Sequence, residues 1–218
     1  QVVERFMNEV RIFFILSHPN IVRIHDIGHA EKTIFISMEY VDGSSLRSIL
    51  DKRGKDSHMS IRQSIYIISQ LCNALKYAHR YMVHRDIKPD NIMVTRNNHI
   101  KLMDFGISKL KDNRFESHAG VIVGTPYYMA PEQIHNAPDV DGRADIYSLG
   151  VVLYELLTGT LPTGMRHSIS QDYNHIPVEL EVIIFRCLDP DREQRFQNPG
   201  DLRDALISLN DSLIDNST

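Results

Sequence analysis

Residues 84–91 read His-Arg-Asp-Ile-Lys-Pro-Asp-Asn, and this stretch decides the fold that we expect. It brings two carboxylates, a lysine and an amide together in a few positions. Two further motifs follow in order, Asp-Phe-Gly at 104–106 and Ala-Pro-Glu at 130–132. One tripeptide arises easily by chance, but three ordered motifs do not. We therefore expect these polar residues to share a chemical task.

Taken singly, the same residues have ordinary explanations. Asp86, Asp90 and Asn91 would more often be turn and capping residues, and His84 a buried core histidine. Phe105 alone would be a core residue. Only the combination of the motifs favours a functional site for the polar set.

Hydrophobic spacing divides the chain into a small mixed part and a larger helical part. A helix is expected to end near residue 17, followed by two strand-like stretches at 21–27 and 33–41 with a polar turn between them. Asp42-Gly43-Ser44 then breaks the pattern. Beyond it we expect helices at 60–81, 144–158, 178–188 and 199–214, and strands at 92–95 and 100–103. We expect a loop at 104–132 and find no helical spacing at 163–175.

Two of these helices carry start signals. Ser60 and Gln63 form the pattern of a capping box, and Asn198 precedes Pro199 in a first helical turn.

Composition excludes several classes of protein. The chain has 218 residues, 42% of them hydrophobic, enough for one large domain or a domain with part of another. Its net charge of −4 comes from scattered acidic and basic residues, so neither a nucleic-acid nor a membrane surface is indicated. Cys72 and Cys187 are too few for a disulfide framework and are expected to be buried thiols. Without an apolar run long enough to span a bilayer, we expect a cytoplasmic location for this segment.

The three motifs resemble the catalytic loop, the metal-binding triplet and the activation-segment end of serine/threonine protein kinases. The wording at 18–22, 38–43 and 145–150 looks most like the bacterial members of that family. The resemblance implies an α+β, protein-kinase-like fold with a truncated, β-rich N-lobe and a complete, mainly helical C-lobe. The implied parts are a partial N-lobe at 1–41, a C-lobe at 42–212 and a polar tail at 213–218.

The resemblance also implies the reaction, which is transfer of the γ-phosphoryl group of ATP to a protein Ser or Thr hydroxyl. Asp86 would orient that hydroxyl or accept its proton, and Lys88 would neutralise charge on the moving group. Lys88 is also what points to serine or threonine as acceptor. Asn91 and Asp104 would bind Mg²⁺ through oxygen atoms, and Thr125 would contact Asp86 and Lys88.

Nucleotide-binding positions follow from the same resemblance. Met38 would guard the back of the adenine pocket, and the backbone of Glu39 and Val41 would meet the adenine edge. Asp42 would reach the ribose or simply form a turn. Met93 would lie under the adenine ring.

One expected partner is missing from the sequence. Glu9 corresponds to a glutamate that pairs with a strand lysine, but the 218 residues contain neither Gly-x-Gly-x-x-Gly nor Val-Ala-Ile-Lys. We expect both motifs upstream of Gln1, and we expect the fragment alone to be inactive. Glu9 could otherwise be a solvated helix charge.

Regulation is expected through phosphorylation. Arg85 precedes Asp86 and could bind a phosphate bidentately, with Ser117 as the best candidate site. Dimerisation for autophosphorylation is left open, as is membrane anchorage of the full-length protein.

Structural roles complete the resemblance. His84 and Phe105 would stack in an apolar column with Phe13 and Ile24. Glu132 would form a buried ion pair with Arg195. Asp145 would hold the backbone of the catalytic loop or, alternatively, act only as a helix N-terminal acid.

Two other functions stay open. A pseudokinase that only binds partners would retain the fold without turnover. A small-molecule kinase is disfavoured, because Gly-Thr-Pro at 124–126 and Ala-Pro-Glu form a platform for a peptide acceptor.

Overall fold

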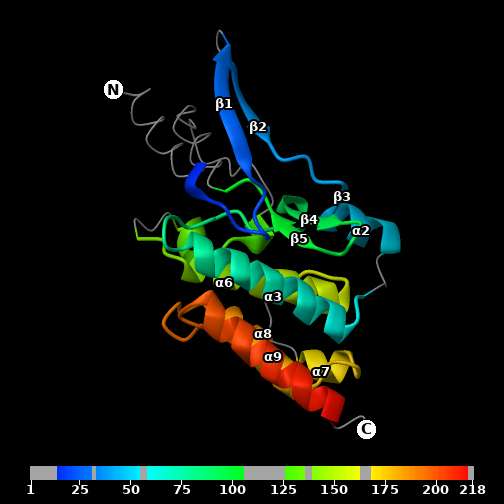
Figure 1. Ribbon diagram of the computed structural model, residues 1–218. Coiled ribbons are helices and arrows are strands. Elements are labelled where there is room, and N and C mark those ends of the chain that lie inside the picture. Colours follow the sequence, from blue (N-terminus) through cyan, green and yellow to red (C-terminus); the bar gives the residue numbers. More distant parts are fainter. Residues whose placement is uncertain are drawn as a thin grey trace.

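The computed structural model describes residues 14–30, 33–54, 58–105, 126–135, 139–162 and 168–215. Figure 1 shows its strands on one side of a body of long helices. In chain order the elements are β1 (Ile24–Ala30), β2 (Thr33–Met38), β3 (Gly43–Ser45), α2 (Leu46–Arg53), α3 (Ile61–Ala78), the 3₁₀ helix η1 (Pro89–Asn91), β4 (Ile92–Thr95), β5 (Ile100–Leu102), the 3₁₀ helix η2 (Pro126–Tyr128), α5 (Pro131–Ile134), α6 (Arg143–Thr158), α7 (Ile169–Asp172), α8 (Val178–Cys187) and α9 (Pro199–Asp215).

The first two strands form an antiparallel hairpin, as expected, but with shifted bounds. β1 starts later than residue 21 and continues through the expected turn to Ala30, and β2 ends at Met38. Gly28, which we expected in the turn, instead pairs with Phe35 within the hairpin. A Cβ on Gly28 would lie 2.0 Å from the Phe35 ring, so the missing side chain lets the ring cover the strand.

We expected residues 42–44 only to break the strand pattern, but Gly43 and Ser44 belong to a third strand, β3. β3 pairs antiparallel with β4, with Gly43 opposite Thr95. A Cβ on Gly43 would lie 2.2 Å from the Val94 carbonyl oxygen, so only glycine permits this approach. Helix α2 then starts at once, because the Ser45 Oγ accepts a hydrogen bond from the Ser48 N–H at 3.2 Å.

The segment before the hairpin is tied to β5. Val22 N donates to Leu102 O at 2.9 Å, and Leu102 N donates to Asn20 O at 2.8 Å. The Asn20 side chain adds a bond from Nδ2 to Ile100 O at 2.8 Å. These bonds fix the base of the hairpin beside the β3-β4-β5 sheet, so the two strand groups meet next to β5.

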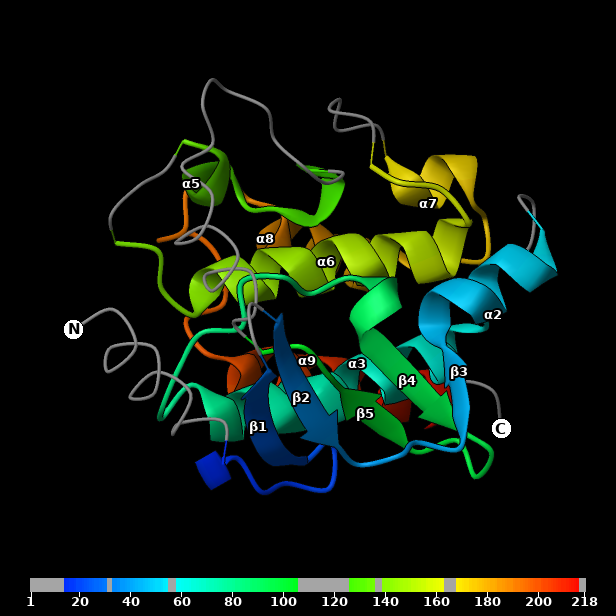
Figure 2. The ribbon, with the colours of Figure 1, turned by 90° about the horizontal axis from the view of Figure 1, so that it is seen from above.

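The long helices lie close to the expected positions. In Figure 2 the strands lie over α3, with α6 beside it and α9 beneath. Ser60 caps α3 by accepting from Gln63 N at 3.3 Å, so the first half of the expected capping box forms. Asn198 caps α9 in the same way through Asp201 N. Helix α9 continues to Asp215, past residue 213, where we expected the polar tail to begin.

Two segments in which we expected no helix contain short helices. The 104–132 segment contains η2 and α5, and α5 starts with Pro131 at a favourable first position. The 163–175 segment contains α7, which is stabilised from a distance by a bond from Ser170 N to Glu181 Oε2 at 2.9 Å. A partner on another helix leaves no signal in the local spacing.

The two cysteines are buried and unpaired. Burial raises the pKa of Cys187 to about 12 and that of Cys72 still further, so both are unreactive thiols. Among the helices in the described ranges, none combines the length and the apolar character needed to cross a bilayer.

Candidate active site

The segment between α3 and η1, residues 79–88, is called the catalytic loop here because of its expected role. Asp145, fully buried in the first turn of α6, holds this loop. Its carboxylate accepts hydrogen bonds from His84 N at 2.9 Å and from Arg85 N at 2.7 Å. The His79 ring adds a contact from Nε2 at 2.8 Å. Asp145 therefore lies where we expected the loop's anchor, whereas sequence reasoning missed His79.

The His84 side chain connects the catalytic loop with Met103, the residue after β5. Its Nε2 lies 3.0 Å from Met103 O, and its Nδ1 accepts from Asp86 N at 3.2 Å. Burial holds the pKa of His84 below its usual value, so the ring is neutral, with the proton on Nε2. The ring also packs against Phe105, with centroids 4.5 Å apart. This pair is part of the expected apolar column.

The polar residues of the expected active site converge on Asp86. The Lys88 ammonium lies 2.9 Å and 3.0 Å from the two carboxylate oxygens of Asp86. The Asn91 amide nitrogen donates to Asp86 O at 2.7 Å and to Asp86 Oδ2 at 3.0 Å. Because the amide nitrogen is used in this way, the amide oxygen of Asn91 is the atom left for a cation.

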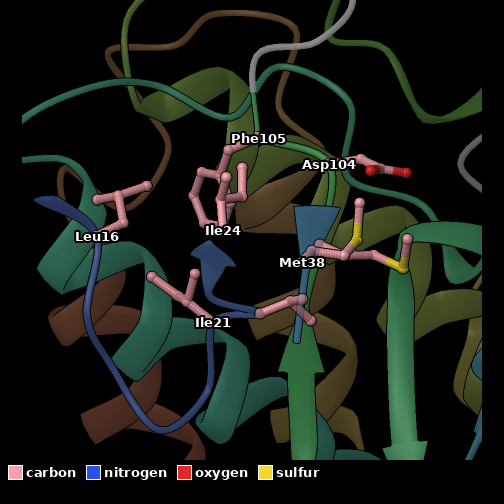
Figure 3. A pocket seen from close by; sticks show the side chains of 8 residues that line it. Leu16, Ile21, Ile24, Met38, Asp104 and Phe105 are labelled. Atoms are coloured by element: carbon pink, nitrogen blue, oxygen red, sulfur yellow. The ribbon is translucent and has the colours of Figure 1, made fainter. Parts of the chain in front are cut away.

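Asp104 lies two residues after the end of β5, and the intervening Met103 is bonded to Asn91. Met103 N donates to Asn91 O at 3.0 Å, which brings the start of the Asp-Phe-Gly motif beside η1. Asp104 has a positive φ of 62°, an uncommon conformation for a residue with a side chain. Figure 3 shows the Asp104 and Phe105 side chains directed to opposite sides. The turn thus separates a carboxylate from an apolar ring.

A pocket extends from Asp104 and Phe105 towards the hairpin (Figure 3). Met38 and Ile24 lie in its wall, where the back of an adenine site and the apolar column were expected. The remaining lining side chains are Leu16, Ile21, Val22 and Met103. The expected column member Phe13 lies outside the described residues.

The expected hinge follows β2. Glu39 N donates to Arg23 O at 2.8 Å, while the Glu39 carbonyl and the Val41 backbone form no hydrogen bond within the described ranges. Lys101, which sequence reasoning missed, lies 2.8 Å from the Glu39 carboxylate. Burial alone would raise the pKa of Glu39, but the Lys101 and Arg23 hydrogen bonds outweigh it and lower the pKa. The ion pair fastens the hinge to β5.

Asp42 and Met93, which we expected to contact the nucleotide, have other neighbours in the structure. The Asp42 carboxylate lies 3.1 Å from Arg96 Nε, and its own carbonyl accepts from Arg96 N, so it is part of an exposed turn. Met93 lies on β4 opposite Ser45 and Lys101 and is not among the residues that line the pocket of Figure 3.

Glu132 and Arg195 form the ion pair that the sequence suggested. The two carboxylate oxygens of Glu132 accept from Arg195 Nη1 at 2.7 Å and Nη2 at 2.9 Å. Arg195 is only 1% exposed, and its Nε donates to Asp189 O at 2.7 Å. Burial alone would raise the pKa of Glu132, but the Arg195 hydrogen bonds outweigh it and lower the pKa. The pair joins α5 to the segment before α9.

Arg85 has a different partner from the expected phosphate. Its Nη2 donates to Val140 O at 3.0 Å, in the segment that precedes α6. Three other expected site residues, Glu9, Ser117 and Thr125, lie outside the described residues.

Sequence reasoning also missed a partly buried ionic cluster beside the site. Arg47 on α2 pairs with Glu155 on α6 at 2.9 Å, and the Tyr128 hydroxyl donates to the same carboxylate at 2.6 Å. Asp90 lies 3.9 Å from the Arg47 guanidinium. The sequence signal was Glu155 itself, a lone acid inside the apolar run of α6. The cluster links α2, η1, η2 and α6.

The oxygen atoms present suit Mg²⁺. A carboxylate from Asp104 and an amide oxygen from Asn91 are hard ligands, and Mg²⁺ usually takes only one or two such groups together with phosphates and water. In the described ranges no three His, Cys, Asp or Glu residues form a metal cluster. A carboxylate and an amide oxygen fit a cation whose other ligands are phosphate oxygens and water.

Comparison with known proteins agrees with this geometry. A family model described as "Protein kinase domain" matches residues 1–217. The crystal structure of the Mycobacterium tuberculosis PknI kinase domain superposes with a TM-score of 0.77 at 29% identity, covering 94% of this chain and 78% of that chain. This chain belongs to the protein kinase domain family, and the expected α+β, protein-kinase-like fold is confirmed.

Two curated relatives illustrate the match. Serine/threonine-protein kinase PknB of Mycobacterium leprae is 36% identical over 225 residues, and serine/threonine-protein kinase Pkn1 of Myxococcus xanthus is 38% identical over 226 residues. Each match covers 94% of this chain but only 36% and 32%, respectively, of the relative. The chain thus spans about a third of the length of these relatives.

Proposed function

We propose that this chain is the catalytic region of a serine/threonine protein kinase, which transfers the γ-phosphoryl group of ATP to a Ser or Thr hydroxyl of a protein. The observation that carries the proposal is the Asp86 carboxylate, held between the Lys88 ammonium and the Asn91 amide on a loop anchored by Asp145. The names of the relatives in Mycobacterium leprae and Myxococcus xanthus support the type of acceptor.

Asp86 and Lys88 have complementary roles in this proposal. The Asp86 carboxylate accepts the hydrogen bond of the substrate hydroxyl and directs its oxygen at the γ-phosphorus. The Lys88 ammonium, 2.9 Å from that carboxylate, supplies positive charge where the phosphoryl group moves. Thr125 is proposed to contact both residues from the acceptor side.

Asn91 Oδ1 and the Asp104 carboxylate would hold Mg²⁺, which neutralises phosphate charge when bound. The adenine is proposed to lie between Met38 and Met93, with its edge against the backbone of Glu39 and Val41. We keep Asp42 as a candidate ribose contact, although its Arg96 partner would have to move.

We also propose how the catalytic region is regulated and how the chain is divided into lobes. Arg85 would exchange its Val140 partner for a phosphate on Ser117, and Glu9 would pair with the strand lysine that the kinase resemblance implies. The proposed division is a partial N-lobe at 1–41 and a C-lobe from residue 42 that includes the whole of α9 up to Asp215, rather than ending at 212. A cytoplasmic location and autophosphorylation within a dimer are further proposals.

A partner-binding pseudokinase is the second candidate. The presence of Asp86, Lys88, Asn91 and Asp104 disfavours it, whereas absence of the strand lysine from the full-length protein would favour it. It differs from the leading proposal in one measurable respect, since it would bind a partner without turning over ATP.

The test is a phosphorylation assay with the full-length protein, Mg²⁺, γ-labelled ATP and a mixed Ser/Thr peptide library. We expect label on Ser or Thr and, in Asp86→Asn, a loss of kcat of about a thousandfold or more. ATP binding should persist in that variant. Binding of ATP with no transfer by the parent protein would favour the pseudokinase, and label on small molecules alone would refute a protein acceptor.

A further inference from the structure

The peptide bond between Arg85 and Asp86 is held at both of its polar atoms. Its N–H, from Asp86, donates to His84 Nδ1 at 3.2 Å. Its carbonyl, from Arg85, accepts from the Gln133 side-chain nitrogen at 2.8 Å. A peptide unit is planar, so fixing its oxygen and its hydrogen fixes the rotation of the whole plane and the position of the next Cα. That Cα carries the Asp86 carboxylate.

This peptide follows a strained residue. Arg85 has a φ of 67°, in the left-handed region, which costs a residue with a Cβ about 1 kcal/mol or more. Such a conformation persists only where its surroundings hold it. Asp145 holds the Arg85 N–H at 2.7 Å, and Gln133 is the group that holds the carbonyl. Loss of the Gln133 bond leaves the peptide plane fixed on one side only.

Gln133 uses both ends of its amide. While Nε2 donates to Arg85 O, its Oε1 accepts from Ala130 N at 3.1 Å. Ala130 is the residue before α5, at the end of the segment that starts at Asp104. A single side chain therefore joins the backbone at the end of this segment to the backbone that carries Asp86.

We propose that Gln133 is a positioning residue for Asp86, which orients the Arg85–Asp86 peptide and couples the catalytic loop to the start of α5. The inference rests on the proposed kinase function for its effect on catalysis. Gln133 itself lies behind the loop and touches no reacting atom. Displacement of α5 would withdraw the Gln133 donor and let the Asp86 carboxylate leave its orientation.

A simpler role for Gln133 would be to cap α5 through its oxygen alone. Three variants separate the two roles, because they keep the acceptor alone, the donor alone or neither group of the amide. Gln133→Glu keeps an acceptor for Ala130 N but loses the donor to Arg85 O. Gln133→Lys keeps a donor that can reach Arg85 O but loses the acceptor. Gln133→Met keeps neither and has a similar length.

The three variants are compared with the parent in the full-length protein by steady-state kinetics. We expect kcat to fall about tenfold to a hundredfold in the Glu and Met variants, with KM for ATP little changed, and to recover largely in the Lys variant. Recovery in the Glu variant and loss in the Lys variant would overturn the proposal in favour of capping. Unchanged kcat in all three would also overturn it.

A second measurement does not depend on activity. Hydrogen exchange of the Asp86 amide, followed by NMR, reports the bond to His84 Nδ1, and we expect faster exchange in the Glu and Met variants than in the Lys variant. Equal exchange in all variants would contradict the positioning role even if kcat changed. If the parent phosphorylates nothing but the exchange order holds, the kinase proposal fails and the role of Gln133 in orienting this peptide stands.

Discussion

The Asp145 carboxylate accepts a hydrogen bond from the Arg85 backbone N–H at 2.7 Å, and through it α6 carries the loop that presents Asp86. The same carboxylate accepts from His84 N and contacts His79 Nε2. Four elements meet at this point, namely the end of α3, the catalytic loop, the start of α6 and, through Gln133, α5. The proposed catalytic residues Asp86 and Lys88 lie on a loop, and the buried Asp145 carboxylate holds the backbone of that loop.

Replacing Asp145 tests this anchoring. Asp145→Asn keeps one acceptor oxygen but turns an N–H₂ towards backbone donors in a fully buried site, so we expect unfolding free energy to fall by roughly 3 kcal/mol. Asp201→Asn is the matched control, because Asp201 is an exposed acid in the first turn of α9. Its loss should cost only about 0.3 to 1 kcal/mol. Urea unfolding curves give both values, and equal costs would mean that Asp145 is merely a helix N-terminal acid.

The ion pair between Glu132 and Arg195 predicts a second substitution that strongly lowers the free energy of unfolding. Arg195→Met leaves the Glu132 carboxylate without its bidentate partner, which typically destabilises a fold by about 3 to 5 kcal/mol. The control is the pair of Arg203 with Asp204, in which the acid is largely exposed. Asp204→Ala should change stability by less than about 1 kcal/mol. Denaturation of the two variants under one buffer condition compares them, and similar costs would count against a buried pair.

The lowered pKa of Glu132 gives stability a defined pH dependence. Its ordinary value is 4.5, and in the fold the Arg195 hydrogen bonds outweigh the opposing effect of burial. At a pH just below 4.5 the unfolded chain therefore binds more protons than the folded chain, so stability rises with pH there. The contribution is complete above the unfolded pKa and is lost as pH falls through the folded pKa.

We expect Glu132→Gln to flatten this dependence. Unfolding free energy, measured between about pH 5 and about pH 3, should decline less steeply in the variant than in the parent protein. A parallel decline in the two proteins would show that Glu132 has no lowered pKa in the fold.

The cluster of Arg47, Glu155 and Tyr128 predicts that substitutions at Arg47 and Glu155 have non-additive effects on the free energy of unfolding. Arg47→Met removes the cation from a carboxylate that is 8% exposed, and it should cost roughly 2 kcal/mol or more, allowing for the partial exposure of Arg47. The further change Glu155→Gln removes the stranded charge and retains a partner for the Tyr128 hydroxyl. A double-mutant cycle should give a coupling of about 1 to 3 kcal/mol, whereas additive costs would contradict a shared cluster.

Local signals in the sequence predicted the long elements well. Ser60 and Asn198 are caps whose partners lie three residues away, so their bonds to Gln63 and Asp201 follow from the chain itself. The His-Arg-Asp and Asp-Phe-Gly motifs gave the family by their order. The same logic could have found α2, since Ser45 precedes Leu46 and Leu50 at helical spacing, but the glycine before it was interpreted only as a break.

Other features depended on distant partners. From the sequence alone Gly28 is expected in a turn, whereas in the fold the Phe35 ring covers it. Helix α7 forms where Glu181, on another helix, supplies a hydrogen-bond acceptor. Lys101 on β5 gave no sign that it pairs with Glu39, because the two are far apart in sequence. Such contacts are consequences of packing, and neither propensity nor spacing contains them.

The central claim is that Asp86, Asn91 and Asp104 surround one magnesium–nucleotide site. Its most direct test is a crystal structure of the full-length protein with Mg²⁺ and a non-hydrolysable ATP analogue. We predict Asn91 Oδ1 and an Asp104 carboxylate oxygen at about 2.0 to 2.1 Å from the metal, with the Asp86 carboxylate facing the γ-phosphoryl group. A metal bound away from Asn91 and Asp104, or a γ-phosphoryl group remote from Asp86, would contradict the account.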